Sequence, residues 1–168
     1  MKNPKDKKRV DHKSIPPFIN KDSNTLILGS LPSVKSRADG FFYAHPQNRF
    51  FKLLAAIFKE EEPKTIEQRK AFLTKHDIAL YDVIFACDIY GSSDATIENV
   101  EPIDLKRLLK QYPNIKRIFT TGKKAKELYD KYLLPQVGIE AVSLPSSSAA
   151  NASMSFDKLV ESYCVILE

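Results

Sequence analysis

Several residue types that define common classes of protein are scarce in this sequence. The 168 residues include only two cysteines and no tryptophan. Cys87 and Cys164 are far apart and show no CxxC or Cys/His spacing, which argues against a disulfide scaffold or a structural zinc site. No stretch approaches the roughly 18 apolar residues of a membrane span, and the charged N-terminus lacks the apolar segment of a secretory signal. We therefore expect a cytoplasmic protein with no membrane partner.

The five glycines are also too few and too scattered for the usual phosphate-binding loops. "TTGKKAKEL" has one glycine before its lysine pair, which is insufficient for a P-loop. "GSLPS" (Gly29 to Ser33) lacks the second glycine of a nucleophile elbow. His45 could act as a base for Ser30, but no third residue is placed to orient it, so a serine hydrolase is disfavoured. With three histidines and no HxxxH pattern, we expect neither a metal nor a cofactor.

The positive charge is concentrated at one end of the chain. Residues 1–13 contain six basic and two acidic residues, a net +4 of the total +5. A basic tail of this kind can strengthen phosphate contacts without sequence preference, but it does not make the rest of the chain a nucleic-acid binder. We expect residues 1–20 to form a flexible basic arm and residues 21–168 to form one domain, since the length suits one core.

Short apolar runs alternate with segments of helical periodicity. Strands are expected in "SNTLILGS", over residues 78–85, in "NIKRIFTTG" and in "GIEAVSL". Helices are expected in "NRFFKLLAAIFKE", "TIEQRKAFLTKH", "EPIDLKRLLKQY", "KKAKELYDKYL" and "SFDKLVESYCVIL". This alternation predicts an α/β fold in which a central four-stranded, mainly parallel sheet has helices on both faces.

The loops that follow three of these strands contain most of the candidate site residues. Ligands bind at the carboxyl ends of the strands in such a sheet, so Asn48, Asp94 and Ser146–Asn151 are expected to converge. "GFFYAHPQNRFFKLL" would then line a crevice, with aromatic walls and a polar edge suited to a flat, uncharged group such as a nucleobase. From composition and spacing alone, an ordinary aromatic core and an ordinary Ser-rich loop are the simpler explanation.

Four motifs taken together carry a more specific signal. "ILGSLPS", "FFYAHPQNRFFKLL", "LYDVIFACDIYGSSDATI" and "LPSSSAAN" resemble the motifs of the uracil-DNA glycosylase superfamily, most closely its hypoxanthine-DNA glycosylase branch. The resemblance covers the chain from about Thr25 to its C-terminus. The His-Pro-x-Asn-Arg-Phe run also occurs in mismatch-specific uracil-DNA glycosylases of the same superfamily.

The resemblance implies a role for individual residues. The base-binding residues would be Gly29, Ser30, Leu31, Ser33, Tyr43 and Asp94, with Tyr43 stacked on the extruded base and Asp94 either touching it or bracing its loop. The catalytic residues would be Asn48 and His45. The loop that contacts the DNA backbone would contribute Ser146, Ser147, Ser148 and Asn151. Leu31 stands where the superfamily usually has a catalytic Asp or Asn, and we expect Arg49 to pair with a carboxylate.

The implied activity is that of a monofunctional DNA glycosylase of base-excision repair. Asn48 would orient water through its carbonyl oxygen, while main-chain amides of residues 29–33 and the imidazole of His45 would stabilise the departing base. The expected partner is single- or double-stranded DNA containing a deaminated base, and the expected state is a monomer. Two alternatives stay open: a uracil- or mismatch-selective glycosylase of the same fold, and a nucleic-acid-binding relative without turnover.

Overall fold

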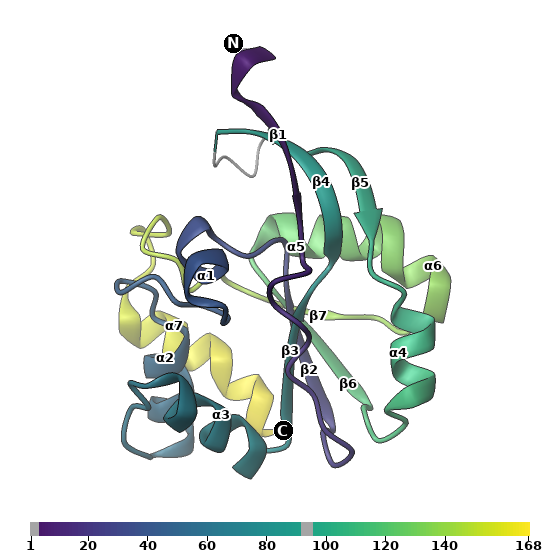
Figure 1. Ribbon diagram of the computed structural model, residues 1–168. Coiled ribbons are helices and arrows are strands. Elements are labelled where there is room, and N and C mark those ends of the chain that lie inside the picture. The colour runs from purple at the N-terminus through teal and green to yellow at the C-terminus, as the bar shows by residue number, and fades with distance from the viewer. Residues whose placement is uncertain (1–3, 92–95) are drawn as a thin grey trace.

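A four-stranded parallel sheet forms the centre of the molecule. The computed structural model describes residues 4–91 and 96–168 (Figure 1). The sheet has the strand order β3-β2-β6-β7, and every neighbouring pair is parallel. Its strands are β2 (Thr25–Gly29), β3 (Ile78–Asp82), β6 (Arg117–Thr121) and β7 (Val142–Leu144). The expected fold class is therefore confirmed.

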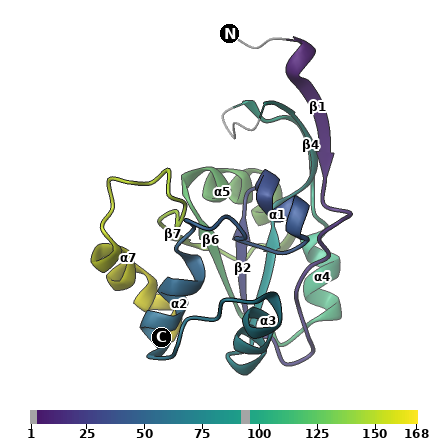
Figure 2. The ribbon, with the colours of Figure 1, turned by 60° about the vertical axis from the view of Figure 1, so that its left-hand side comes forward.

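Helices cover both faces of this sheet. On one side lie α2 (Phe50–Phe58), α3 (Ile66–Lys75) and α7 (Phe156–Tyr163); on the other lie α4 (Leu105–Gln111), α5 (Lys123–Leu128) and α6 (Leu134–Val137) (Figures 1 and 2). A π-helical segment, η3 (Tyr129–Leu133), joins α5 to α6, and the short 3-10 segments η1 (Pro4–Asp6) and η4 (Cys164–Leu167) lie near the two ends. Because the sheet is covered twice, every residue of β2 and β3 is buried.

The segment expected as one strand over residues 78–85 is two strands in different sheets. β3 ends at Asp82, which is in register with Gly29 of β2. The amides of Val83 and Ile84 still donate to the carbonyls of Gly29 and Ser30, whereas the carbonyl of Val83 accepts from Ile103. The chain therefore passes from the parallel sheet to the smaller sheet at these two residues. It continues as β4 (Ile84–Tyr90), which pairs with β5 (Glu98–Pro102), a strand that the sequence analysis did not expect.

The N-terminal segment packs on the domain, which differs from the separate arm expected for residues 1–20. β1 (Lys7–Asp11) is antiparallel to β4 along its whole length, so the smaller sheet has the order β1-β4-β5. His12 and Ile15 are buried, and Phe18 forms a bridge with Leu80 of β3. The far end of this sheet extends beyond the parallel sheet in both views (Figures 1 and 2). Local charge does not reveal this pairing, because the partner strand is about 80 residues away.

The loop expected after β2 contains a short helix, α1 (Val34–Asp39). The hydroxyl of Ser33 accepts the amide proton of Ser36 over 3.1 Å and caps the first turn. Gly40 closes the helix in the left-handed region, at φ +74°. Six residues are too few to show a helical period in the sequence, which is why propensity alone did not find this helix.

Candidate active site

A cavity of about 630 Å³ lies at the carboxyl edge of the parallel sheet. The last residues of three neighbouring strands line it: Gly29 of β2, Asp82 of β3 and Thr121 of β6. The loops after β2 and β7 supply most of the remaining wall. The cavity therefore lies where an open α/β sheet is expected to bind its ligand.

Most of the predicted site residues line this one cavity. They are Gly29, Ser30, Leu31, Ser33, Tyr43, His45, Asn48, Ser146, Ser147 and Ser148. Asp94 lies outside the residues that the structure describes. Asn151 is not among the lining residues: its amide group donates to the carbonyl of Ser146 over 3.0 Å, which ties the loop to itself.

The ring of Tyr43 is held rigidly beside the cavity. It stacks on Phe50 with the ring centroids 3.8 Å apart and the planes 13° from parallel. Its hydroxyl is 3.1 Å from Oγ1 of Thr121, so both ends of the side chain are fixed. Burial, together with the negative charge of Asp82, raises the pKa of Tyr43 far above its ordinary value. Tyr43 is therefore a neutral, immobile aromatic surface on which a flat ring could stack.

Asn48 is oriented by two donors. The amide of Phe50 donates to its Oδ1 over 3.0 Å, and the hydroxyl of Ser147 donates to the same oxygen over 2.8 Å. Because a main-chain N–H can only donate, these contacts identify the oxygen of the side-chain amide, and they occupy both of its lone pairs. The carbonyl oxygen that we expected to orient water is therefore already engaged. The Nδ2 group is the part of this amide that can serve a ligand.

His45 lies at the exposed mouth of the same cavity. The amide of Gln47 donates to Nδ1 of its ring over 3.1 Å. Nδ1 must therefore carry a lone pair, and a neutral His45 carries its proton on Nε2. The turn thus leaves Nε2–H as a donor. His45 also starts the turn that positions Asn48, since its carbonyl accepts the Asn48 amide over 2.9 Å.

Arg49 joins the start of α2 to the serine loop after β7. Its guanidinium donates to the carbonyls of Met154, Ser148 and Asn151 at distances of 2.9, 3.1 and 3.1 Å. Our prediction that Arg49 pairs with a carboxylate is wrong, because its guanidinium binds three main-chain oxygens. The planar guanidinium can reach several acceptors at once, which suits it to hold an irregular loop in one shape.

The serines of this loop are in different environments. Ser147 is buried, and its hydroxyl donates to Asn48; the contact with the DNA backbone that we expect of Ser147 stays a prediction. The hydroxyls of Ser146 and Ser148 accept main-chain protons from Ser148 and Ala150, each over 3.2 Å, and both residues reach the cavity wall. Ser146 and Ser148 therefore stabilise turns within the loop, whereas the hydroxyl of Ser147 binds Asn48.

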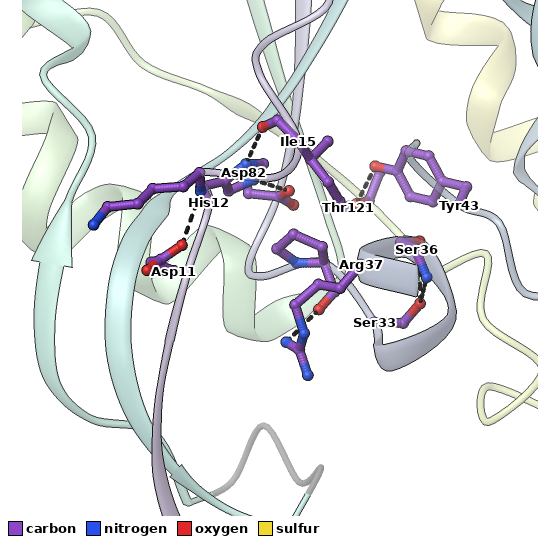
Figure 3. Close-up of polar contacts among 11 residues, drawn as sticks. Asp11, His12, Ile15, Ser33, Ser36, Arg37, Tyr43, Asp82 and Thr121 are labelled. Atoms are coloured by element: carbon purple, nitrogen blue, oxygen red, sulfur yellow. Dashed lines mark hydrogen bonds and ion pairs between the residues drawn. The ribbon is translucent and has the colours of Figure 1, made fainter. Parts of the chain in front are cut away.

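Asp82 lies in the cavity wall and His12 lies behind it, and the sequence analysis missed both residues. Nε2 of His12 is 2.7 Å from Oδ2 of Asp82 (Figure 3). Burial alone would lower the pKa of His12, but the hydrogen bond and charge of Asp82 outweigh it and raise the pKa above its ordinary value. Asp82 could have been found from the sequence, because it directly follows the buried run "IALY"; extending that strand to Phe85 hid it. His12 offered no such signal.

A charged cluster for a metal does not occur in the part of the chain that the structure describes. Among the same residues, no helix has both the length and the apolar character needed to cross a membrane.

Comparison with known proteins identifies the family. The model of the Uracil DNA glycosylase superfamily matches residues 16–165. The chain belongs to this superfamily. It is accordingly a DNA glycosylase, an enzyme that cleaves the bond between a base and its deoxyribose.

Two curated proteins and a solved structure are similar to this chain over most of its length. A protein of Methanosarcina barkeri named hypoxanthine DNA glycosylase is 36% identical over 137 residues, which are 81% of this chain and 85% of that protein. One of Methanosarcina acetivorans with the same name is 35% identical over 144 residues, 85% and 90% of the two chains. The solution NMR structure of an M. acetivorans protein proposed to be a uracil DNA glycosylase has a TM-score of 0.76 at 31% identity. It covers 92% of this chain and 97% of its own.

Proposed function

We propose that this glycosylase removes hypoxanthine from DNA by hydrolysis, with Asn48 as the catalytic residue that holds the attacking water. The observation that carries the proposal is the fixed amide of Asn48 beside the Tyr43 ring in one cavity. The two curated relatives named hypoxanthine DNA glycosylase support the choice of base. Asn48 takes the role usually given to the first motif, because Leu31 has no polar atom with which to orient water.

The target nucleotide must leave the helix before it can enter this cavity. Extrusion costs least at a weak or mismatched pair, which favours a deaminated base. The extruded base would stack on Tyr43, which keeps its position without a base because Phe50 and Thr121 hold it. A platform that is already rigid loses little further conformational entropy when the base arrives.

Cleavage would begin with departure of the base. The glycosidic bond breaks, its electron pair goes to the base, and positive charge develops on the sugar. The Nε2–H of His45 and main-chain amides of residues 29–33 would stabilise the departing anion. Water held by Nδ2 of Asn48 would keep one lone pair free to attack the sugar, and its released proton would balance the charge of the base.

The lysine in the cavity wall supports hydrolysis without strand cleavage. Lys35 is exposed, and its ammonium group is 3.1 Å from a carboxylate oxygen of Asp39, one helical turn away. A Schiff base needs a lysine amine that is free to attack the sugar, and the Lys35 amine is instead engaged by Asp39. We therefore propose a monofunctional enzyme. We also propose that it acts as a monomer and in the cytoplasm.

Single-turnover excision tests the proposal. Labelled single strands and duplexes containing one hypoxanthine, uracil or xanthine are incubated with the enzyme and then treated with alkali, which cuts at abasic sites. We expect alkali-dependent cleavage at hypoxanthine, and a loss of about 100- to 1,000-fold in Asn48→Ala with DNA binding retained. Gln47→Ala, an exposed neighbour, is the matched control. Cleavage only at uracil would move the enzyme to a uracil-selective branch, and binding without cleavage of any base would leave a non-catalytic module.

A further inference from the structure

The smaller sheet continues past the edge at which the cavity opens. Asp82 ends β3 in the cavity wall, and the chain runs on into β4, whose seven residues span about 23 Å of extended chain. β1 and β5 flank β4, and the far end of this sheet projects beyond the parallel sheet (Figures 1 and 2). A nucleotide that enters the cavity from DNA therefore brings its flanking backbone close to the smaller sheet.

One face of the smaller sheet is turned toward the cavity. Ile89 of β4 is buried and lines the cavity wall. In the antiparallel pair of β1 and β4, Lys8 is directly opposite Ile89, and Val10 is opposite Cys87. Directly opposed residues share a face of the sheet, with their Cβ atoms about 5 Å apart. The side chain of Lys8 therefore starts beside a side chain of the cavity wall.

The basic residues on either side of Lys8 belong to the opposite face. Side chains alternate along a strand, so Lys7 and Arg9 point away from the cavity side. A carboxylate oxygen of Asp88 is 3.7 Å from the Lys7 ammonium, and the other is 3.4 Å from the Arg9 guanidinium. The Arg9 guanidinium is also 3.7 Å from a carboxylate oxygen of Glu101. Acidic residues of the same sheet therefore neutralise these two cations.

The cations on the cavity side lack such neutralisation. Lys8 is exposed, and no carboxylate of residues 4–91 and 96–168 forms an ion pair with it. Arg37 of α1 lines the cavity, and its guanidinium donates to the main-chain carbonyl of Pro32 over 3.0 Å. Figure 3 shows this guanidinium on the side of α1 away from Tyr43. The surface that runs from the cavity to β1 thus carries positive charge that can attract an anion.

We propose that the cavity-side face of β1 is a second DNA-contacting surface, on which Lys8 binds a backbone phosphate that flanks the extruded nucleotide. This inference rests on the proposed entry of that nucleotide into the cavity. A lysine ammonium on its flexible stem acts as a point charge, which suits a phosphate. Because phosphates carry no sequence information, the contact adds affinity for any DNA and leaves the choice of base unchanged.

The salt dependence of DNA binding measures such a contact. Each phosphate neutralised on a duplex contributes about −0.9 to the slope of the logarithm of affinity against the logarithm of salt concentration. We expect Lys8→Gln to make the slope shallower by about 0.9. Over a roughly fourfold rise in salt, its affinity then falls about 3.5-fold less than that of the wild type. Lys7→Gln removes the same charge from the opposite face, and as the matched control it leaves the slope unchanged.

Excision kinetics separate a backbone contact from a role in catalysis. On a hypoxanthine duplex under single-turnover conditions, Lys8→Gln raises the enzyme concentration that gives half the maximal rate and leaves the maximal rate unchanged. It also weakens binding to hypoxanthine-containing and undamaged duplexes by the same factor, because a phosphate contact does not read the base. A lower maximal rate in Lys8→Gln would contradict the proposed role.

Shortening the duplex locates the phosphate. Two series of duplexes are trimmed from the 5′ or the 3′ side of the damaged base. Because Lys8 lies on one side of the cavity, trimming one flank abolishes the difference in affinity between Lys8→Gln and the wild type, whereas trimming the other preserves it. A difference that persists in both series would mean that Lys8 binds no flanking phosphate.

Circular dichroism and thermal unfolding check that each variant is folded. Equal slopes for wild type and Lys8→Gln would overturn the inference. Equal reductions in Lys8→Gln and Lys7→Gln would overturn it too, because only net charge would then matter. Binding is measured without cleavage, so a wild-type enzyme that binds DNA but removes no base would refute the proposed function, and the slopes would still decide the Lys8 contact.

Discussion

The hydroxyl of Ser147 donates to Oδ1 of Asn48 over 2.8 Å, across 99 positions of sequence. This bond joins the turn before α2 to the loop after β7, and it turns the amide so that Nδ2 remains for a ligand. The catalytic geometry that we propose for Asn48 therefore depends on a residue from the other end of the chain.

Replacing Ser147 by alanine tests this dependence. Without the hydroxyl, Asn48 keeps only the Phe50 amide as a donor and its side chain gains freedom. We expect excision to fall about 10-fold, because small displacements of a catalytic group are costly, and stability to fall by about 1 kcal/mol. Single-turnover excision and urea unfolding measure the two effects. Ser153→Ala, an exposed serine of the same loop, is expected to change neither; equal losses in both variants would contradict the specific role of Ser147.

Arg49 is expected to stabilise the protein through its loop contacts. Arg49→Met leaves three main-chain carbonyls without the guanidinium that donates to them. Some of these carbonyls bind water instead once the loop relaxes. We expect a loss of about 2–3 kcal/mol in the free energy of unfolding, and Arg49→Lys should recover only part of it, because an ammonium cannot span the three acceptors. Urea titration gives both values. Arg107→Met, on the exposed face of α4, serves as the control, and a loss no larger than its own would refute the role of Arg49.

Gly29 is expected to tolerate no side chain. The methyl group of Gly29→Ala would overlap Oδ1 of Asp82, so either the carboxylate or the strand end must move. We expect a loss of about 1–3 kcal/mol and a clear drop in excision. Gly138→Ala places a methyl in open space at φ +67°, where only backbone strain of about 1–2 kcal/mol applies. Excision by Gly138→Ala should therefore be normal, and normal excision by Gly29→Ala would show that the close approach is unimportant.

The His12–Asp82 pair predicts a pH dependence of stability. The pKa of His12 is raised in the folded protein above its ordinary value of 6.5, so the folded state holds the proton more tightly than the unfolded state. Its stabilising contribution is fully present below about pH 6.5 and is lost as the pH rises through the higher folded-state pKa. The other titratable group against the ring, Tyr81, stays neutral in this range because burial, with the charge of Asp82, raises its pKa.

Thermal unfolding of wild type and His12→Phe from pH 6 to pH 9 measures this contribution. The advantage of the wild type over His12→Phe should shrink as the pH increases. An advantage that is constant, or that grows with pH, would mean that the His12 proton does not contribute to stability as described.

Local sequence was sufficient to predict the four strands of the parallel sheet, apart from the end of β3, and the longer helices that cover it. Buried strands such as "TLILG" are short continuous apolar runs, and α2 repeats its apolar residues at helical spacing, so nearest neighbours along the chain contain the information. Ligands lie at the carboxyl ends of parallel strands, and this rule correctly predicted that Tyr43, Asn48 and the serine loop line one cavity. The motifs identified the superfamily, because their residues and order are specific.

The tertiary structure decided what each of these residues contacts. The pairing of β1 with β4 and the burial of His12 come from a strand about 80 positions away, and no local pattern records such a partner. The orientation of Asn48, the carbonyl partners of Arg49 and the use of Ser147 depend on hydrogen bonds between the two ends of the chain. Composition and periodicity report which side chains prefer burial. They do not report which distant donor meets which acceptor, and in this cavity that choice determines the chemistry.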